Sequence, residues 1–192
     1  MLQESTMLEL GTTAPDFSLP DVSTGRTVSL ADFSAEKALL VIFLCAHCPY
    51  VVHVQAQLAQ LARDYAGRRL AIVGITSNEI VDHPQDAPAP TAAMARAAGL
   101  TFPILFDESQ AVAKAYTAAC TPDFFLFDAR RSLAYRGQLD ASRPSRGTSD
   151  GRDLRAAIDA TLAGLPAVPR QLPSTGCNIK WKPGNEPAYF RG

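Results

Sequence analysis

The stretch "VIFLCAHCPYVV", residues 41–52, constrains the fold and chemistry of this chain more than any other. An apolar run ends in Cys45 and Cys48, which are separated by two residues, and Pro49 follows. The apolar run has the length of a strand buried on both faces, whereas the residues after Cys48 change to helical spacing. Two cysteines at a strand-to-helix junction can serve redox chemistry, bind a metal or form an inert disulfide.

The position of the pair favours redox chemistry. Residues three apart on a first helical turn share a face, so their sulfurs can meet, and free N–H groups with the helix dipole stabilise a thiolate. We expect Cys45, at the helix tip, to be exposed, to have a lowered pKa and to attack first. Cys48, one turn in, is expected to be shielded and to act second, and Pro49 fits the first turn. His47 is either an exposed polar residue or a donor that favours the Cys45 thiolate.

Metal binding is the main competing use of the pair. A structural zinc site needs four ligands, usually two such pairs, but the other two cysteines, Cys120 and Cys177, are far apart in the sequence. A c-type haem needs a histidine directly after the second cysteine, where this chain has Pro49. The sequence therefore predicts no metal and no cofactor.

Composition places the chain among soluble globular proteins. Of its 192 residues 47% are hydrophobic and 19% charged, and the net charge is −1. This charge gives no attraction to nucleic acid or to an anionic membrane, so neither partner is expected. The start, "MLQESTMLELG", lacks the apolar core of a secretory signal, and no apolar run is long enough to span a bilayer. We expect a cytoplasmic protein, in which disulfides are usually transient or catalytic.

Strand-like and helix-like segments alternate along the chain. Two short extended segments flank a turn at residues 23–25, and a late antiparallel pair is predicted within residues 123–139. This order predicts an α/β sandwich in which helices flank a mixed central sheet, with an N-terminal β-hairpin extension. Buried strands are predicted at 37–45, 69–77 and 102–107, and helices at 48–67, 91–99, 109–117 and 151–164.

The C-terminal part of the chain lacks this alternation of strand-like and helix-like segments. Residues 165–192 contain five prolines and no clear periodicity. A free tail would gain nothing from large apolar side chains, yet this one carries Ile179, Trp181, Tyr189 and Phe190. We expect residues 1–164 to form one domain and residues 165–192 to be an ordered tail packed on it, with Trp181 substantially buried.

At this point the chain resembles the thioredoxin-like superfamily, in its redoxin branch of alkyl hydroperoxide reductase and thiol-specific antioxidant (AhpC/TSA) proteins. The resemblance lies in "APDFSLPDVSTGRTVSL", "LLVIFLCAHCPYV" and "CTPDFFLFD". It implies a thioredoxin-like sandwich with Cys45 as the attacking and Cys48 as the resolving cysteine. It also implies a cis bond between Thr121 and Pro122, in a substrate-facing turn that lies against the Cys45 sulfur.

The chain departs from two patterns of that superfamily. Many thioredoxins have a buried acid in the strand before the first cysteine, whereas "ALLVIFL" is wholly apolar. Peroxiredoxins have Thr or Ser three residues before the peroxidatic cysteine, and here Cys45 holds that place relative to Cys48. The second departure favours dithiol exchange over peroxide reduction.

The other two cysteines suggest a second disulfide. Cys120 precedes the Thr-Pro turn, and Cys177 lies in a tail able to dock there. A bond between them would close a long loop, worth about 3–5 kcal/mol in the entropy model. Two unrelated buried thiols are the alternative.

These observations predict a thiol–disulfide oxidoreductase that acts through Cys45 and Cys48. Its partners would be a disulfide-containing protein or small-molecule thiol substrate and a recycling reductant or oxidant. A thiol-dependent peroxidase of the peroxiredoxin type is one alternative. The other is a non-enzymatic thiol- or metal-binding module that uses Cys45, Cys48 and His53.

Overall fold

The computed structural model describes residues 1–167 and 171–190. The helices are α1 (Pro49–Asp64), α2 (Pro88–Ala98), α3 (Ala111–Ala115) and α4 (Arg152–Leu162), with 3₁₀ turns η1 (Leu30–Phe33) and η2 (Pro84–Asp86). The strands are β1 (Leu2–Glu4), β2 (Ser18–Pro20), β3 (Thr27–Ser29), β4 (Ala38–Phe43), β5 (Leu70–Thr76), β6 (Ile104–Phe106), β7 (Cys120–Thr121), β8 (Asp123–Phe127), β9 (Leu133–Gly137) and β10 (Thr175–Asn178).

A five-stranded mixed sheet with the order β6-β5-β4-β8-β9 forms the centre of the fold. β4 pairs in parallel with β5 and antiparallel with β8, so both of its edges are hydrogen-bonded. All six β4 residues are buried, as the continuous apolar run predicts. The expected α/β sandwich with a mixed sheet is confirmed.

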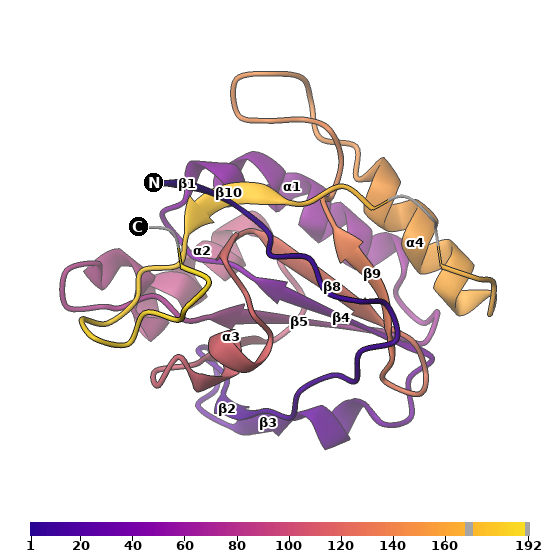
Figure 1. Cartoon of the computed structure of the whole chain (residues 1–192), viewed down its shortest axis with the longest axis horizontal. Helices are drawn as coiled ribbons and strands as arrows, with labels where there is room; N and C mark the ends of the chain where they lie inside the picture. The colour runs from indigo at the N-terminus through magenta and orange to yellow at the C-terminus, as the bar shows by residue number, and fades with distance from the viewer. Residues whose placement is uncertain (168–170, 191–192) are drawn as a thin grey trace.

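Helices cover both faces of this sheet. Leu40 and Ile42 of β4 point into a core cluster shared with α1, α2 and α4, whereas Leu39 and Val41 point into a second cluster shared with α3. Figure 1 shows α1 and α4 above the sheet and α3, with β2 and β3, below it. Among the described residues, no helix combines the length and the apolar character needed to cross a bilayer.

Two smaller sheets complete the structure. β2 and β3 pair antiparallel, with Leu19 opposite Val28, and form the predicted N-terminal hairpin. β10 lies between β1 and β7 and is antiparallel to both, so it joins the two ends of the chain above the central sheet (Figure 1). The sequence analysis predicts neither β1 nor β10.

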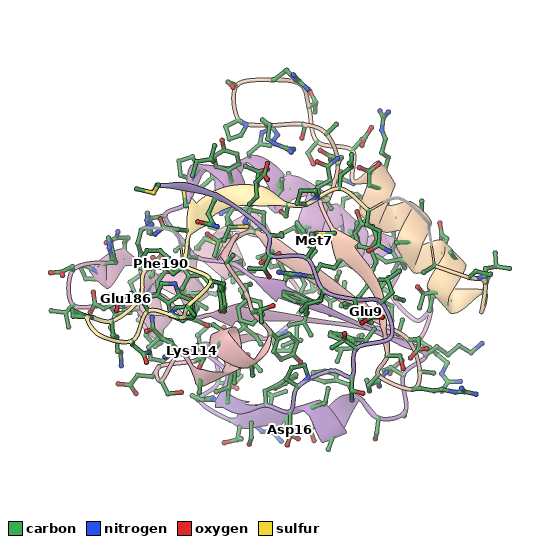
Figure 2. All side chains as sticks on the ribbon, in the orientation of Figure 1. Met7, Glu9, Asp16, Lys114, Glu186 and Phe190 are labelled. Carbon is green, nitrogen blue, oxygen red and sulfur yellow. The ribbon has the colours of Figure 1, made fainter. Side chains whose placement is uncertain are left out.

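The described part of the C-terminal segment packs on the body. Trp181 is 8% exposed and contacts Tyr189 edge-on, and both belong to the cluster beneath the sheet. Figure 2 shows Glu186 and Phe190 on the same side of the molecule as Lys114 of α3. Burial of Trp181 is confirmed. Of the expected tail, residues 168–170 and 191–192 lie outside the described residues, and the division into a 1–164 domain and a tail stays a prediction.

A buried ion pair joins β8 to β9. Arg136 donates to both carboxylate oxygens of Asp123 at 2.9 and 3.3 Å, and both side chains are fully buried. Asp123 also accepts from Ser5 Oγ at 2.7 Å and from the Ala119 amide at 3.1 Å. The guanidinium lies 3.8 Å from the centre of the Phe125 ring. Removing one partner would leave the other charge buried and unpaired, at a cost of about 3–5 kcal/mol.

The burial of the single tryptophan gives a stability prediction. Trp181→Ala should lower the free energy of unfolding by about 3–5 kcal/mol, because it leaves a cavity between the C-terminal segment and the sheet. Val81→Ala is the control, since Val81 is 85% exposed and its truncation should change stability by less than about 0.5 kcal/mol. Urea unfolding followed by circular dichroism measures both. Equal stability of the two variants would contradict this packing.

Candidate active site

The two cysteines of the motif lie between β4 and α1, but not where the sequence analysis expects them on the helix. The helix begins at Pro49, which occupies its first position as predicted, and Cys48 is the N-cap residue with extended backbone angles. Cys45 lies three residues before the cap, outside the helix. The expectation that Cys45 occupies the helix tip is wrong, because Pro49 fixes the first helical position after Cys48 and not before it.

A buried carboxylate holds the loop between the cysteines. Asp86, from η2, accepts the backbone N–H groups of Ala46 at 2.8 Å and His47 at 3.2 Å, and the side-chain amide of Asn78 at 2.7 Å. The Nδ1 atom of His47 lies 2.6 Å from Asp86 Oδ2, and the His47 ring stacks on His83. The Nδ1 atom of His47 is therefore engaged by Asp86, and the influence of His47 on the Cys45 thiolate stays a prediction.

The turn before β8 meets both cysteines. The Thr121–Pro122 bond is cis, as expected. The Thr121 hydroxyl lies 3.3 Å from Cys45 Sγ, and the Thr121 carbonyl accepts from the Cys48 thiol at 3.2 Å. The structure thus brings together Cys45, Cys48, Thr121 and Pro122, and it confirms that the turn lies against the Cys45 sulfur.

The expected difference in exposure between the cysteines is absent. Cys45 and Cys48 are both 0% exposed and belong to the core cluster between the sheet and α1. The prediction of an exposed Cys45 is wrong because the Thr-Pro turn and the Asp86 loop enclose it. A reagent must therefore reach either sulfur through a small opening or after local movement.

The environment divides the two thiols electrostatically. The pKa of Cys45 is raised well above the ordinary thiol value, first because its thiol donates to Cys48, then by burial and by the charge of Asp86. The pKa of Cys48 is lowered to about 4, although burial opposes it, by donation from Cys45 and then from Cys177, Thr121 and the Val51 amide. The Thr121 carbonyl oxygen accepts a hydrogen bond only from a neutral Cys48 thiol, and it therefore opposes a negative charge on Cys48. The groups that donate to the Cys48 sulfur are more numerous and favour the negative charge. These directions make Cys48 the sulfur that its surroundings favour as a thiolate, and they are opposite to the lowered pKa expected of Cys45.

The predicted bond between Cys120 and Cys177 is also wrong. All four cysteines are free thiols. In the β7–β10 pair Cys120 is opposite Asn178, whereas Cys177 is opposite Thr121. Successive side chains of a strand point to opposite faces, so this register points Cys120 and Cys177 to opposite faces of the small sheet. Cys120 is fully buried and donates weakly to the carbonyl of Pro122 at 3.7 Å.

One group of side chains near the motif has the composition of a metal site. The potential ligand atoms of Cys45, His47 and Asp86 lie within 4.8 Å of one another. A metal at these atoms would have to replace the hydrogen bond between His47 and Asp86. His53, the histidine considered from the sequence, is not in this group and hydrogen-bonds Ser142 at 2.8 Å.

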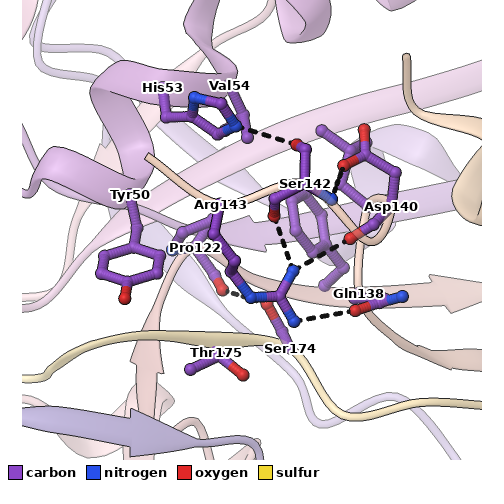
Figure 3. Close-up of a pocket in the computed structure, with 12 residues that line it drawn as sticks. Tyr50, His53, Val54, Pro122, Gln138, Asp140, Ser142, Arg143, Ser174 and Thr175 are labelled. Carbon is purple, nitrogen blue, oxygen red and sulfur yellow. Dashed lines mark hydrogen bonds between the residues drawn. The ribbon is translucent and has the colours of Figure 1, made fainter. Parts of the chain in front are cut away.

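A small hollow lies beside Pro122. Figure 3 shows its walls, which come from α1, the segment after β9 and the start of β10. Arg143 crosses it and donates to Gln138 Oε1 at 2.9 Å and to the Ser142 carbonyl at 2.7 Å. The lining includes Tyr50, His53, Ser174 and Thr175.

A cysteine pair at the start of a helix, facing a cis-proline turn on a mixed sheet, defines a thioredoxin-like protein. The model of the AhpC/TSA family matches residues 10–136, and the chain belongs to this family. A Mycobacterium tuberculosis protein with the name "Putative peroxiredoxin Rv2521" is 31% identical over 117 residues. The match covers 61% of this chain and 69% of that protein.

Solved structures extend the likeness to nearly the whole chain. An uncharacterized conserved protein from Geobacillus kaustophilus is 47% identical, with a TM-score of 0.93 over 95% of this chain and 97% of that one. A hypothetical protein from Sinorhizobium meliloti is 49% identical, with a TM-score of 0.91 over 93% and 98%. The thioredoxin domain of a Bacteroides vulgatus thiol-disulfide oxidoreductase shares the fold at 18% identity and a TM-score of 0.63, over 81% of this chain and 99% of that one.

The assignment of the thiolate to Cys48 gives a pH prediction. Thiolate absorbance in the ultraviolet should appear as the pH rises through about 4, since Cys48 loses its proton there. Cys45→Ala removes the largest stabilising donor, a charged hydrogen bond worth about 1.5–3 kcal/mol. This loss should raise the pKa of Cys48 by about one to two pH units.

Cys120→Ser is the matched control for this titration. Burial raises the pKa of the Cys120 thiol, so its removal should leave the transition near pH 4 unchanged. If Cys45→Ala abolishes the low-pH transition and Cys48→Ala retains it, the assignment of the thiolate is reversed.

Proposed function

We propose that the protein is a thiol–disulfide oxidoreductase that exchanges a disulfide between the Cys45/Cys48 pair and a protein or small-molecule thiol substrate. One observation carries the proposal: both sulfurs contact the same residue, Thr121, of the cis-proline turn. In the superfamily that the chain resembles, this turn faces the substrate. The small hollow beside Pro122 opens on the α1 side of this turn, and neither cysteine lines it (Figure 3).

The order of attack in this proposal differs from the order expected from the sequence. The Cys48 thiolate attacks one sulfur of the substrate disulfide, which forms a mixed disulfide and releases one substrate thiolate. Cys45 then gives up its proton and attacks Cys48 Sγ. This step forms the Cys45–Cys48 disulfide and releases the second substrate thiol. The sequence assigns the first attack to Cys45, but the donors around Cys48 and the charge of Asp86 beside Cys45 favour Cys48.

The same steps run backwards when the Cys45–Cys48 disulfide oxidises a substrate dithiol. Each direction needs a second partner, a recycling reductant or oxidant, to restore the starting state. We propose the cytoplasm as the compartment, as expected from the sequence, where cellular thiols can supply the reductant.

Peroxide reduction is the second candidate, and a specific observation favours it. Cys48 caps the helix N-terminus, is followed by Pro49 and is enclosed, and a small peroxide needs less opening of the site than a bulky disulfide does. Cys48 would attack the peroxide O–O bond, becoming a sulfenic acid and releasing an alcohol or water. Cys45 would then attack that sulfur, forming the disulfide and releasing water. The cysteine at position 45, where peroxiredoxins have Thr or Ser, favours the first candidate.

A reaction with oxidised glutathione tests the main proposal. The reduced full-length protein should release two molecules of glutathione for each Cys45–Cys48 disulfide formed. Cys48→Ser should lower the rate constant by about a hundredfold or more, because it removes the nucleophile. The rate should be constant between about pH 6 and 8, where the thiolate is fully formed.

The matched control variant is Cys120→Ser, which should react at the wild-type rate. Hydrogen peroxide in place of the disulfide separates the two candidates. Rapid peroxide consumption with no glutathione release would favour the peroxidase, and no reaction with either reagent would reject both.

A further inference from the structure

A third cysteine lies against the pair. Cys177 of β10 is opposite Thr121 in the β7–β10 register, and Thr121 is the residue that both Cys45 and Cys48 contact. Directly opposite residues of an antiparallel pair point to the same face. Cys177 therefore points to the face of the small sheet on which the Thr121 side chain lies, and it packs against the core cluster that contains both cysteines.

A glycine brings β10 this close. A Cβ atom at Gly176 would lie 1.9 Å from the Thr121 carbonyl oxygen, which is a separation that real Cβ atoms do not reach. The same oxygen accepts from the Cys48 thiol. Any side chain at residue 176 would push β10 away from the cis-proline turn, so the glycine keeps Cys177 beside Cys48.

Cys177 and Cys48 also interact through a hydrogen bond between their sulfurs. Burial, followed by donation of its thiol to Cys48, raises the pKa of Cys177 to about 11. Of the three thiols Cys177 alone is partly exposed, whereas Cys45 and Cys48 are enclosed. Cys48 thus interacts with both other sulfurs, and of these Cys177 is the partly exposed one.

We propose that Cys177 is a third redox-active cysteine, which resolves intermediates on Cys48 by forming a Cys48–Cys177 disulfide. This inference rests on the proposed function, since it needs an intermediate on Cys48. It adds a second resolving thiol to the same site, in the C-terminal strand. From the sequence, Cys177 was a candidate partner of Cys120 or an unrelated buried thiol.

The steps balance without another oxidant. Cys177 loses its proton to water or to the departing thiolate and attacks Cys48 Sγ of the mixed disulfide. The bond between Cys48 and the substrate breaks, the substrate leaves as a thiol, and Cys48–Cys177 forms. Cys45 can then attack Cys48 Sγ, which releases Cys177 as a thiol and forms Cys45–Cys48. The protein loses two electrons in total, and they reduce the substrate disulfide.

The test removes Cys45, because one tryptic peptide, residues 38–63, contains both Cys45 and Cys48. Full-length Cys45→Ser is reduced, treated with oxidised glutathione, alkylated and digested. Mass spectrometry should find peptide 38–63 joined by a disulfide to peptide 171–180, which contains Cys177. Release of the second glutathione should be at least about tenfold faster than in Cys45→Ser/Cys177→Ser, where Cys48 should remain glutathionylated.

Cys45→Ser/Cys120→Ser is the matched control and should still form the joined peptides. Circular dichroism melting checks that every variant folds. Glutathionylated Cys48 without joined peptides would overturn the role of Cys177, while the wild-type reaction through Cys45 and Cys48 would leave the proposed function intact. Joining of peptide 171–180 to peptide 115–130, which contains Cys120, would also overturn it. No reaction of the wild-type protein with glutathione would instead reject the proposed function.

Discussion

The buried ion pair between Asp123 and Arg136 supports the cis-proline turn of the site. Asp123 follows the cis-proline directly, so its position fixes the turn that Cys45 and Cys48 both contact. Its carboxylate also accepts from Ser5, which follows β1, while Arg136 donates to Thr6 at 3.0 Å. The pair thus connects the N-terminal segment, the turn and β9 at one point. Charges this deeply buried are stable only when each has its partner, and this requirement ties the three segments together.

Two electrostatic influences of opposite sign make the two cysteines unequal in their tendency to carry a negative charge. The carboxylate of Asp86 lies on the Cys45 side and opposes a negative charge there. The start of α1 lies on the Cys48 side and offers free N–H groups to a negative charge. Both influences favour the proton on Cys45 and the negative charge on Cys48. The same Asp86 holds the loop between them, so one side chain acts on both the geometry of the loop and the charge of Cys45.

Local sequence patterns predicted the parts of the structure that local physics determines. The apolar run of β4, the helical spacing of α1 and the late β8–β9 pair were readable because burial and periodicity leave a mark on consecutive residues. The cis turn came from the resemblance. The contacts that define the site join residues far apart in sequence: Asp86 with the loop at Ala46, and Cys177 with Cys48. The residues "GCN" in a proline-rich segment show no alternation of apolar and polar side chains, so the sequence did not predict a strand there. The pairing register, in which Cys177 is opposite Thr121 and not Cys120, decided which sulfur Cys177 faces.

The position of β10 has a consequence for the order of folding. In the small sheet Leu2 is opposite Cys177, so the first and last strands of the fold must find each other across almost the whole chain. Contacts at such sequence separation carry the largest loop-closure entropy and are expected to form after local and neighbouring ones. The central sheet and α1 can therefore assemble before the small sheet closes, and pulsed alkylation of Cys177 during refolding can follow the docking of β10. Docking of β10 beside β7 and the cis-proline turn is then expected late in folding.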